Sequence, residues 1–319
     1  MSQPLFSLLA WTVAKTGSRN QINILINSLS IFFMIEKSYY IVYNMKGTVT
    51  GTIKGTVTGT IKGKRTNKPR HNKTVKTRNN KIDIIYWINM EKSRTRRTHM
   101  MTVLKDDTFD NIEKKRIVAV DGSEPNMETY FRSIFENMDL RKRNVKEYAC
   151  LVSHLNTLIE FSKSDHNIAL IFEDDVSLEY KKYWTKSLNQ VIANAPEGWE
   201  ALQLCINIDK NSTLAKLVTK PLYVKGYAAC AAAYLVNKKG VLRFLHKLYK
   251  NDKFILNKKI EHHADIYILE TMKTYVYRYP MFTYLNKEST LHPDHLTGHT
   301  QSKKIVNELV KKYYDIMNS

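Results

Sequence analysis

The sequence predicts an α/β domain with a mainly parallel central sheet, and three observations support this prediction. Short apolar runs of strand length recur from residue 82 onward. Segments with apolar residues at helical spacing separate several of these runs. The run Ile-Ala-Leu-Ile-Phe at 168–172 is continuously apolar, as in a strand that is covered on both faces. Strands that alternate with helices are typical of a mainly parallel sheet covered by helices.

The same criteria place the individual elements in chain order. We expect strands at 82–88, 117–120, 168–172, 202–208 and 231–236, and extended chain at 275–285. We expect helices at 149–161, 239–250 and 265–272. In the first of these helices Leu151, Leu155 and Leu158 repeat every three or four residues. The strand at 117–120 ends at Asp121-Gly122, a dipeptide typical of turns.

The first 80 residues differ in composition from the rest of the 319-residue chain. They contain 13 Lys and Arg residues and a single acid, Glu36, so they carry +12 of the formal net charge of +20. The octapeptide Gly-Thr-Val-Thr-Gly-Thr-Ile-Lys occurs twice within 47–63, and a basic, Asn-rich stretch follows at 64–81. We therefore expect a low-complexity, disordered basic extension over 1–80 and one folded domain over 81–319.

The basic extension has two interpretations, a solvated linker or an electrostatic tether to nucleic acid or membrane. The linker is favoured, because binding to single-stranded nucleic acid typically uses aromatic residues among the bases and 44–81 has none. Polar residues interrupt the apolar stretch 22–43, which argues against a membrane anchor. Three cysteines are too few for a disulfide scaffold. We expect a cytoplasmic protein, at most peripheral to a membrane, with weak association of the extension with anionic surfaces and no specific nucleic acid.

The strongest chemical signal is the triplet Glu173-Asp174-Asp175, directly after the apolar run 168–172. Buried, unpaired carboxylates cost several kcal/mol, so these side chains must face solvent, a cation or a ligand. The carboxyl ends of parallel strands are where open α/β sheets bind ligands. Carboxylates that converge there suit a hard cation such as Mg²⁺ or Mn²⁺. The alternative is an acidic turn that caps a following helix, around 179–190.

Histidines mark three weaker candidates. His154 lies on the predicted helix 149–161, where a lone histidine is more often structural than a ligand. His262, His263 and Asp265 could bind a metal, or Asp265 could be a general base, but a surface helix start explains them equally well. A third group, His292, His295 and His299 with Asp294, is expected in a C-terminal loop and could contact a metal or a diphosphate.

Short motifs, taken in order, resemble glycosyltransferase family 25, which contains lipooligosaccharide and procollagen galactosyltransferases. The resemblance rests on Ile88-Asn89-Met90-Glu91 with Arg96-Arg97, Val120-Asp121-Gly122, Ala149-Cys150-Leu151-Val152-Ser153-His154, Ile171-Phe172-Glu173-Asp174-Asp175-Val176, Ala233-Tyr234-Leu235-Val236 with Lys239-Gly240, Asp265, and Ser289-Thr290-Leu291. The chain departs from the family's pattern at Ala149 and Cys230, where the family has Gly, and at His263, where it has Pro. Residues 1–80 have no counterpart in the family.

The resemblance implies a GT-A-like nucleotide-sugar-binding fold with a UDP-sugar as donor and Mn²⁺ or Mg²⁺ as cofactor. Glu173 and Asp175 would hold the metal. The residues that would contact the donor are Asn89, Arg96, Ser153, His154 and Asp174. Asp265 would be the catalytic base that accepts the proton of the acceptor hydroxyl in an inverting transfer. Its alternative role is a helix cap, and His263 or Glu261 would then be the next candidates for the base.

These implications predict a metal-dependent inverting glycosyltransferase that moves a hexose, galactose or glucose, to a hydroxyl of a glycan or glycoprotein acceptor, as in lipopolysaccharide biosynthesis. Three other classes compete with this reading. One is a non-catalytic sugar-binding relative, altered at Ala149 and Cys230. Another is a nucleic-acid-binding protein that acts through the extension. The last, a metal-dependent hydrolase, would need more converging ligands than the triplet supplies.

Overall fold

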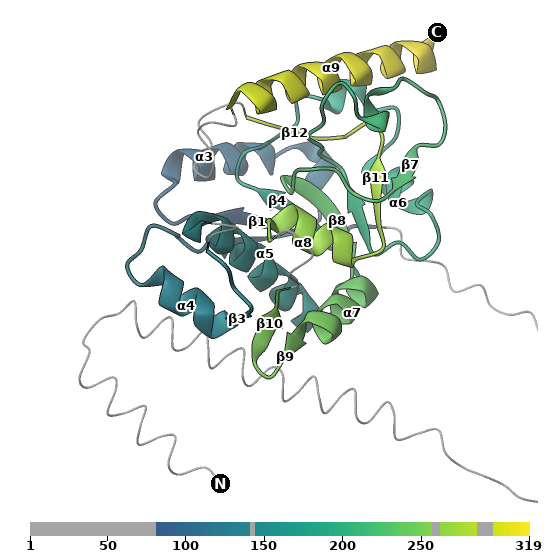
Figure 1. Cartoon of the computed structure of the whole chain (residues 1–319). Helices are drawn as coiled ribbons and strands as arrows, with labels where there is room; N and C mark the ends of the chain where they lie inside the picture. The colour runs from purple at the N-terminus through teal and green to yellow at the C-terminus, as the bar shows by residue number, and fades with distance from the viewer. Residues whose placement is uncertain (1–80, 141–143, 257–261, 286–295) are drawn as a thin grey trace, which may run out of the picture. The chain divides into compact units, whose positions relative to one another are not determined.

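The structure, a computed structural model, describes residues 81–140, 144–256, 262–285 and 296–319. Several predictions lie outside the described residues: those for the extension 1–80, for Glu261, for Ser289-Thr290-Leu291, and for His292, Asp294 and His295. The described residues form an α/β domain around a seven-stranded sheet with the order β2-β1-β4-β8-β6-β11-β7 (Figure 1).

The element bounds are as follows. The central strands are β1 (Ile84–Asn89), β2 (Glu113–Val118), β4 (Ile168–Glu173), β6 (Ala201–Gln203), β7 (Tyr223–Lys225), β8 (Ala233–Asn237) and β11 (Thr274–Tyr277). Two small sheets contain β3 (Phe135–Glu136), β10 (Lys253–Ile255) and β9 (Tyr249–Lys250), and β5 (Val176–Ser177) with β12 (Thr283–Tyr284). The helices are α3 (Arg94–Val103), α4 (Met127–Ile134), α5 (Val145–Lys163), α6 (Leu188–Ala193), α7 (Lys238–Leu248), α8 (Ala264–Thr271) and α9 (Leu296–Asn318).

The central sheet is mixed, so the prediction of a mainly parallel sheet is confirmed only in part. Strand β1 pairs in parallel with β2 and β4, and β6 pairs in parallel with β11. Strand β8 lies between β4 and β6 and is antiparallel to both, and the edge strand β7 is antiparallel to β11. Five strands therefore share one direction, but only three of the six pairings are parallel. The cause is the connection from β6 to β8, which contains a short 3₁₀ turn and β7 instead of the helical crossover that parallel neighbours need.

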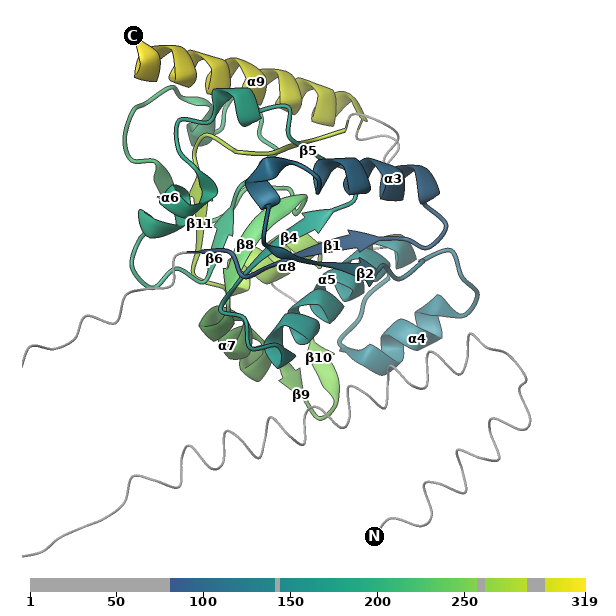
Figure 2. The same cartoon turned by 180° about the vertical axis from the view of Figure 1, so that it is seen from behind.

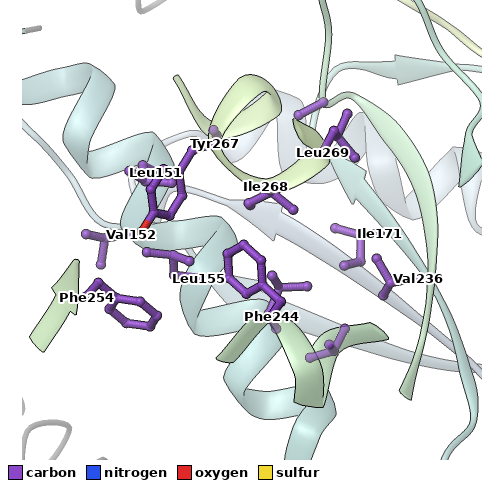
Figure 3. Close-up of a cluster of buried hydrophobic side chains, with 14 of the residues drawn as sticks. Leu151, Val152, Leu155, Ile171, Val236, Phe244, Phe254, Tyr267, Ile268 and Leu269 are labelled. Carbon is purple, nitrogen blue, oxygen red and sulfur yellow. The ribbon is translucent and has the colours of Figure 1, made fainter. Parts of the chain in front are cut away.

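Alternating side chains of the strands fill two cores, one on each face of the sheet. Ile84, Tyr86 and Ile88 of β1 belong to the core under α5, α7 and α8, while Ile85 and Trp87 belong to the core under α3 and α6. Figures 1 and 2, which view the domain from opposite sides, show these two layers of helices. The first core appears in Figure 3, which labels Leu151, Val152, Leu155, Ile171, Val236, Phe244, Phe254, Tyr267, Ile268 and Leu269. Burial on both faces explains why β1, β4 and β8 are continuously apolar.

Helix α5 has a well-defined start. The Asn144 side chain accepts a hydrogen bond from the Glu147 backbone N–H (3.0 Å), and the Glu147 carboxylate accepts one from the Asn144 N–H (2.7 Å). This reciprocal pair is a capping box, which satisfies two of the free N–H groups at a helix start. It fixes where α5 begins, and thereby the height at which Ser153 and His154 lie above the sheet.

Helix α9 occupies a stretch that the sequence interpretation left as a C-terminal loop. His299 therefore lies near the start of a helix and not in a loop, which corrects that prediction. The buried apolar residues of α9 are Val306, Leu309, Val310 and Tyr313. Tyr313 stacks on Tyr279, with ring centroids 3.6 Å apart and planes 9° from parallel. None of the helices in the described part of the chain is both long and apolar enough to span a membrane.

We predict that Gly122→Ala destabilises the domain. A Cβ at this position would lie 2.8 Å from the Cα of Lys146 and 3.1 Å from the Cβ of Ala149, so α5 would have to move. The free energy of unfolding should fall by about 1–3 kcal/mol, as for other overpacking substitutions. Urea denaturation measures the change.

Gly298→Ala in α9 is the matched control, because a Cβ there meets no atom within 4 Å. Alanine is the better helix former by up to about 1 kcal/mol, so this variant should be neutral or slightly stabilised. Equal stability losses in the two variants would contradict the close approach of the Gly122 turn to α5.

Candidate active site

The acidic triplet lies where the central strand β4 ends and a turn leads into β5. Glu173 is the last residue of β4, and Asp174 and Asp175 form the turn before Val176. The helix-cap alternative for these acids is wrong, because β5 follows the turn and α6 begins only at Leu188. The strand end carries the carboxylates to the edge of the sheet, between the ends of β1 and β8.

Asp174 is committed to hydrogen bonds within the domain. Its Oδ2 accepts a hydrogen bond from the side-chain amide of Asn89 (2.7 Å), and its Oδ1 accepts one from Nη1 of Arg96 (2.8 Å). Asn89 ends β1 and also accepts a hydrogen bond from Nε of Arg116 (3.1 Å). Asp174 and Asn89 are buried. This cluster therefore joins β1, α3 and the turn after β4 into one rigid unit.

Asp175 is less fully satisfied. Its Oδ2 lies 3.5 Å from Nη1 of Arg96, but its buried Oδ1 has no hydrogen-bond partner among the residues that the structure describes. The pKa of Asp175 is raised from 3.8 to about 7, first by burial and then by the negative charge of Glu173, against the opposing charge of Arg96. A buried polar atom without a partner needs an explanation. An oxygen ligand beside other carboxylates suits a hard divalent cation. Such a cation would give the Asp175 Oδ1 a partner and would offset the repulsion between the Asp175 and Glu173 charges.

Glu173 turns toward helix α5. Its Oε1 lies 3.1 Å from Nε2 of His154, and Nδ1 of His154 lies 2.9 Å from the hydroxyl of Tyr234 on β8. His154 is 1% exposed, whereas the Glu173 side chain is 30% exposed. The histidine therefore sets the orientation of the carboxylate from below, and the opposite side of that carboxylate stays accessible.

Ser153 has a different role in the structure. Its hydroxyl accepts a hydrogen bond from the Val120 N–H (2.9 Å) and donates one to the carbonyl of Ala149 (2.7 Å). It ties α5 to the segment that follows β2, and it is 2% exposed. The structure thus uses this hydroxyl for anchoring and does not bring it together with the carboxylates.

Asp265 lies in the first turn of α8, but it does not cap the helix, because the N-cap residue is His263. Its Oδ2 accepts a hydrogen bond from the Cys230 N–H (2.7 Å). Two residues further along, the carbonyl of Ala232 accepts a hydrogen bond from the Glu173 N–H (3.0 Å). Two residues span at most about 7 Å. Asp265 and Glu173 therefore flank the same short segment before β8.

The two histidines beside Asp265 have other contacts. Nδ1 of His262 lies 3.0 Å from the Tyr148 hydroxyl, and Nδ1 of His263 lies 3.5 Å from Oε1 of Glu147. His262 is buried. Both histidines therefore bind the start of α5 to the start of α8.

The backbone of Cys230 adopts a conformation that side chains rarely occupy, with φ of 109°. This is the position where the resembling family has glycine, which reaches such angles without strain. The Cys230 Sγ lies 3.5 Å from Sγ of Cys205, and the neighbouring thiol and burial both keep the pKa of Cys230 well above its usual range. The cysteine at this position thus makes the Asp265 contact through a strained backbone.

Sequence reasoning missed three contributors. Tyr234 fixes His154, Arg116 fixes Asn89, and Cys150 lies one helical turn before His154. The spacing of Cys150 and His154, four apart on a predicted helix, was a usable signal. The other two contacts join segments that are far apart in the chain, so the local sequence carries no sign of them.

A large open cavity of about 1150 Å³ is lined by neither the acidic triplet nor Asp265. Its walls are 207–214, 224–228 and the first three turns of α9. The wall includes Tyr227 and Ala228, which immediately precede the segment that holds Asp265. Ser302 of α9 accepts a hydrogen bond from the Ile208 N–H (2.7 Å) and closes one side.

The comparison with protein-family models identifies the class of the protein. The chain belongs to glycosyltransferase family 25, described as an LPS biosynthesis protein, whose model matches residues 82–255, and it is therefore a glycosyltransferase. The search of curated proteins found no match. Among solved structures, the crystal structure of A197 from STIV is 11% identical, with a TM-score of 0.33 over 63% of this chain and 83% of that chain.

We predict that Asp175→Asn stabilises the metal-free protein in a pH-dependent manner. Because the folded pKa of about 7 exceeds the ordinary value of 3.8, the folded state holds the proton more tightly than the unfolded state. The contribution of the protonated Asp175 to the free energy of unfolding is fully present below about pH 4, and it is lost as the pH rises through about 7. Asp175→Asn should therefore match wild type near pH 4 and melt at a higher temperature near pH 8. A thermal melt series without divalent cations tests this, and an equal Tm at pH 8 would contradict it.

We predict that Cys230→Gly is more stable than Cys230→Ala. Both variants lose the thiol, but only glycine relieves the backbone at φ of 109°. Relief of such strain, less the larger chain entropy of glycine, should be worth about 1 kcal/mol. Chemical denaturation of the two variants side by side measures the difference, and a less stable glycine variant would show that the backbone is not strained.

Proposed function

We propose that this glycosyltransferase is metal-dependent and inverting, and that it transfers a hexose from a UDP-sugar to a hydroxyl of a glycan or glycoprotein. The acceptor class that we favour is a lipopolysaccharide-type glycan, in keeping with the description of the family. The nucleotide-sugar-binding half would have a GT-A-like arrangement, with the donor at the ends of β1 and β4.

One observation carries the proposal: the buried, unpartnered Oδ1 of Asp175 beside Glu173, at the end of a central strand. Asp174 is already neutralised by Arg96 and Asn89. The excess negative charge is therefore concentrated on Glu173 and Asp175, and both face the same edge of the sheet. That charge favours the binding of a divalent cation together with an anionic diphosphate.

Glu173 and Asp175 would hold the cation, Mn²⁺ or Mg²⁺. When bound, the cation supplies Lewis-acid stabilisation of the charge that develops on the departing UDP. Arg96, whose side chain is 22% exposed, keeps Asp174 in place, and its guanidinium would also contact the diphosphate. His154 holds Glu173 in one orientation, so that little rotamer freedom is lost when the site fills.

Asp265 would accept the proton of the acceptor hydroxyl. The Cys230 N–H donates to Oδ2 and the Ile266 N–H donates to Oδ1, so the carboxylate is fixed in direction but not paired with a cation by these contacts. An inverting transfer requires the acceptor to attack the anomeric carbon on the face opposite UDP. The acceptor would approach from the cavity bounded by Tyr227 and α9, since Tyr227 and Ala228 in its wall lie just before Cys230, whose N–H binds Asp265.

We predict that UDP release requires Asp175 and a divalent cation. In a screen with UDP-galactose, UDP-glucose and UDP-N-acetylglucosamine, Mn²⁺ should support turnover and excess EDTA should abolish it. Asp175→Asn should lose activity, and it should also lose the rise in Tm that Mn²⁺ gives wild type, since binding to the folded state stabilises it.

Glu179→Gln is the control, because Glu179 is exposed and pairs only with Lys303 among the described contacts. It should keep both activity and the Mn²⁺ effect. Full wild-type turnover in excess EDTA would contradict the proposed metal dependence. Absence of UDP release with every donor would favour a non-catalytic sugar-binding protein.

We predict that Asp265→Asn reduces transfer to the acceptor by roughly 10²–10⁴-fold, the usual contribution of a positioned general base. The affinity for the UDP-sugar, measured by calorimetry, should change little. Glu270→Gln on the same helix should leave transfer intact, since Glu270 is exposed and contacts Tyr227. If Asp265→Asn loses thermal stability but keeps its turnover per folded molecule, its role is structural and His263 becomes the next candidate.

A further inference from the structure

Three side chains with different metal-binding chemistry gather between α5 and the end of β4. Cys150 and His154 are four residues apart on α5, so both side chains lie on one face of the helix. Glu173 approaches them from β4. The Cys150 Sγ, a His154 ring nitrogen and a Glu173 carboxylate oxygen all lie within 4.8 Å of one another.

The histidine in this group is held as metal-binding histidines usually are. Its Nδ1 contacts the Tyr234 hydroxyl (2.9 Å), which leaves Nε2 to point at Glu173 (3.1 Å). A partner on the second ring nitrogen is the typical support for a ligating imidazole. Because the Tyr234 hydroxyl can accept as well as donate, it supports the tautomer in which Nε2 carries no proton. A direct hydrogen bond between Nε2 and Oε1 needs a proton between these two atoms. A metal cation could replace that proton and bind both atoms.

The ligand set selects the metal. A thiolate and an imidazole favour borderline or soft ions, whereas Mg²⁺ and Ca²⁺ prefer oxygen ligands only. One sulfur, one nitrogen and one carboxylate oxygen are ligands of Zn²⁺, and three protein ligands leave its fourth position open. We propose that Cys150, His154 and Glu173 form a binding site for Zn²⁺ or a similar thiophilic divalent cation.

The surroundings favour a positive charge at this point. Asp175 and Asp265 lie near enough to act on the Cys150 thiol, and no Lys or Arg of the described residues forms an ion pair with Glu173. Cys150 and Glu173 are both only partly buried, so an ion can enter without unfolding the core. The site shares Glu173 with the proposed donor-metal site, but it needs neither Asp175 nor any glycosyl transfer.

Cobalt binding to the full-length chain tests the proposal. Co²⁺ added alone to the reduced protein should give a thiolate-to-cobalt charge-transfer band that saturates at one equivalent, and Zn²⁺ should displace it. The chain has three cysteines, Cys150, Cys205 and Cys230, so the band can be assigned by substitution. Cys150→Ser should abolish the band, while Cys205→Ser and Cys230→Ser should retain it.

Two further variants make the test specific. Tyr234→Phe should keep the band but weaken affinity for Co²⁺ roughly 10–100-fold, as expected when the support of a ligating histidine is lost. Asp175→Asn should leave the band intact, which separates this site from the proposed donor-metal site. Circular dichroism and Tm show that each variant is folded. Absence of a band in wild type, or a band that survives Cys150→Ser and disappears in Cys230→Ser, would overturn the proposal.

Discussion

Mutual repulsion among the carboxylates at the end of β4 is the constraint on which the arrangement of this domain depends. Three consecutive acids at the end of a strand that is buried on both faces would be unfavourable without compensation. The three acids are accommodated differently. Asp174 accepts hydrogen bonds from Arg96 and Asn89, and Glu173 contacts His154. Asp175 has a raised pKa and an oxygen without a hydrogen-bond partner. These contacts tie α3 and α5 to the end of β4, in addition to the packing of their apolar faces.

The contacts of each carboxylate also distinguish acids with a structural role from acids that remain available to bind a ligand or accept a proton. Asp174 has both oxygens occupied, so its removal would loosen β1 from β4 before it affected any ligand. Asp175 and Asp265 are each held by contacts that leave the charge itself largely uncompensated. The family match covers the acidic triplet but ends before Asp265, so the pairing of these two groups in one site rests on the geometry alone.

Strands covered on both faces were predictable from sequence, and strands at the edges were not. The runs at 82–88, 168–172 and 231–236 overlap β1, β4 and β8 closely, because a buried strand must be apolar throughout. Edge strand β2 is Glu-Lys-Lys-Arg-Ile-Val, and only its last two residues fall in the predicted run at 117–120. Helices α5, α7 and α8 were predicted nearly to their ends, whereas α3 is rich in Arg and Thr and was missed. Helix α9 could have been predicted from the sequence, because its apolar residues repeat at helical spacing: Val306, Leu309, Val310 and Tyr313.

The candidate site was predictable as a list of residues but not as a set of contacts. Glu173, Asp174 and Asp175 stand out because carboxylates rarely follow a buried run without a reason. Which of the three keeps an open oxygen depends on Arg96 and His154, and long-range pairing of this kind leaves no local pattern. The direction of β8 was equally hidden, because it follows from the path of the chain between 204 and 232 and not from the strand itself.

The position of α9 divides the enzyme into two parts that can change separately. The family match ends at residue 255, and α9 begins at Leu296, yet this helix builds one wall of the cavity. It is fastened by the stacked rings of Tyr279 and Tyr313 and by contacts of His299 and Lys303 with Tyr284 of β12. The carboxylates of the triplet do not line this cavity. If the cavity receives the acceptor, as proposed above, substitutions on the cavity side of α9 alter the acceptor while the acids at the end of β4 stay unchanged.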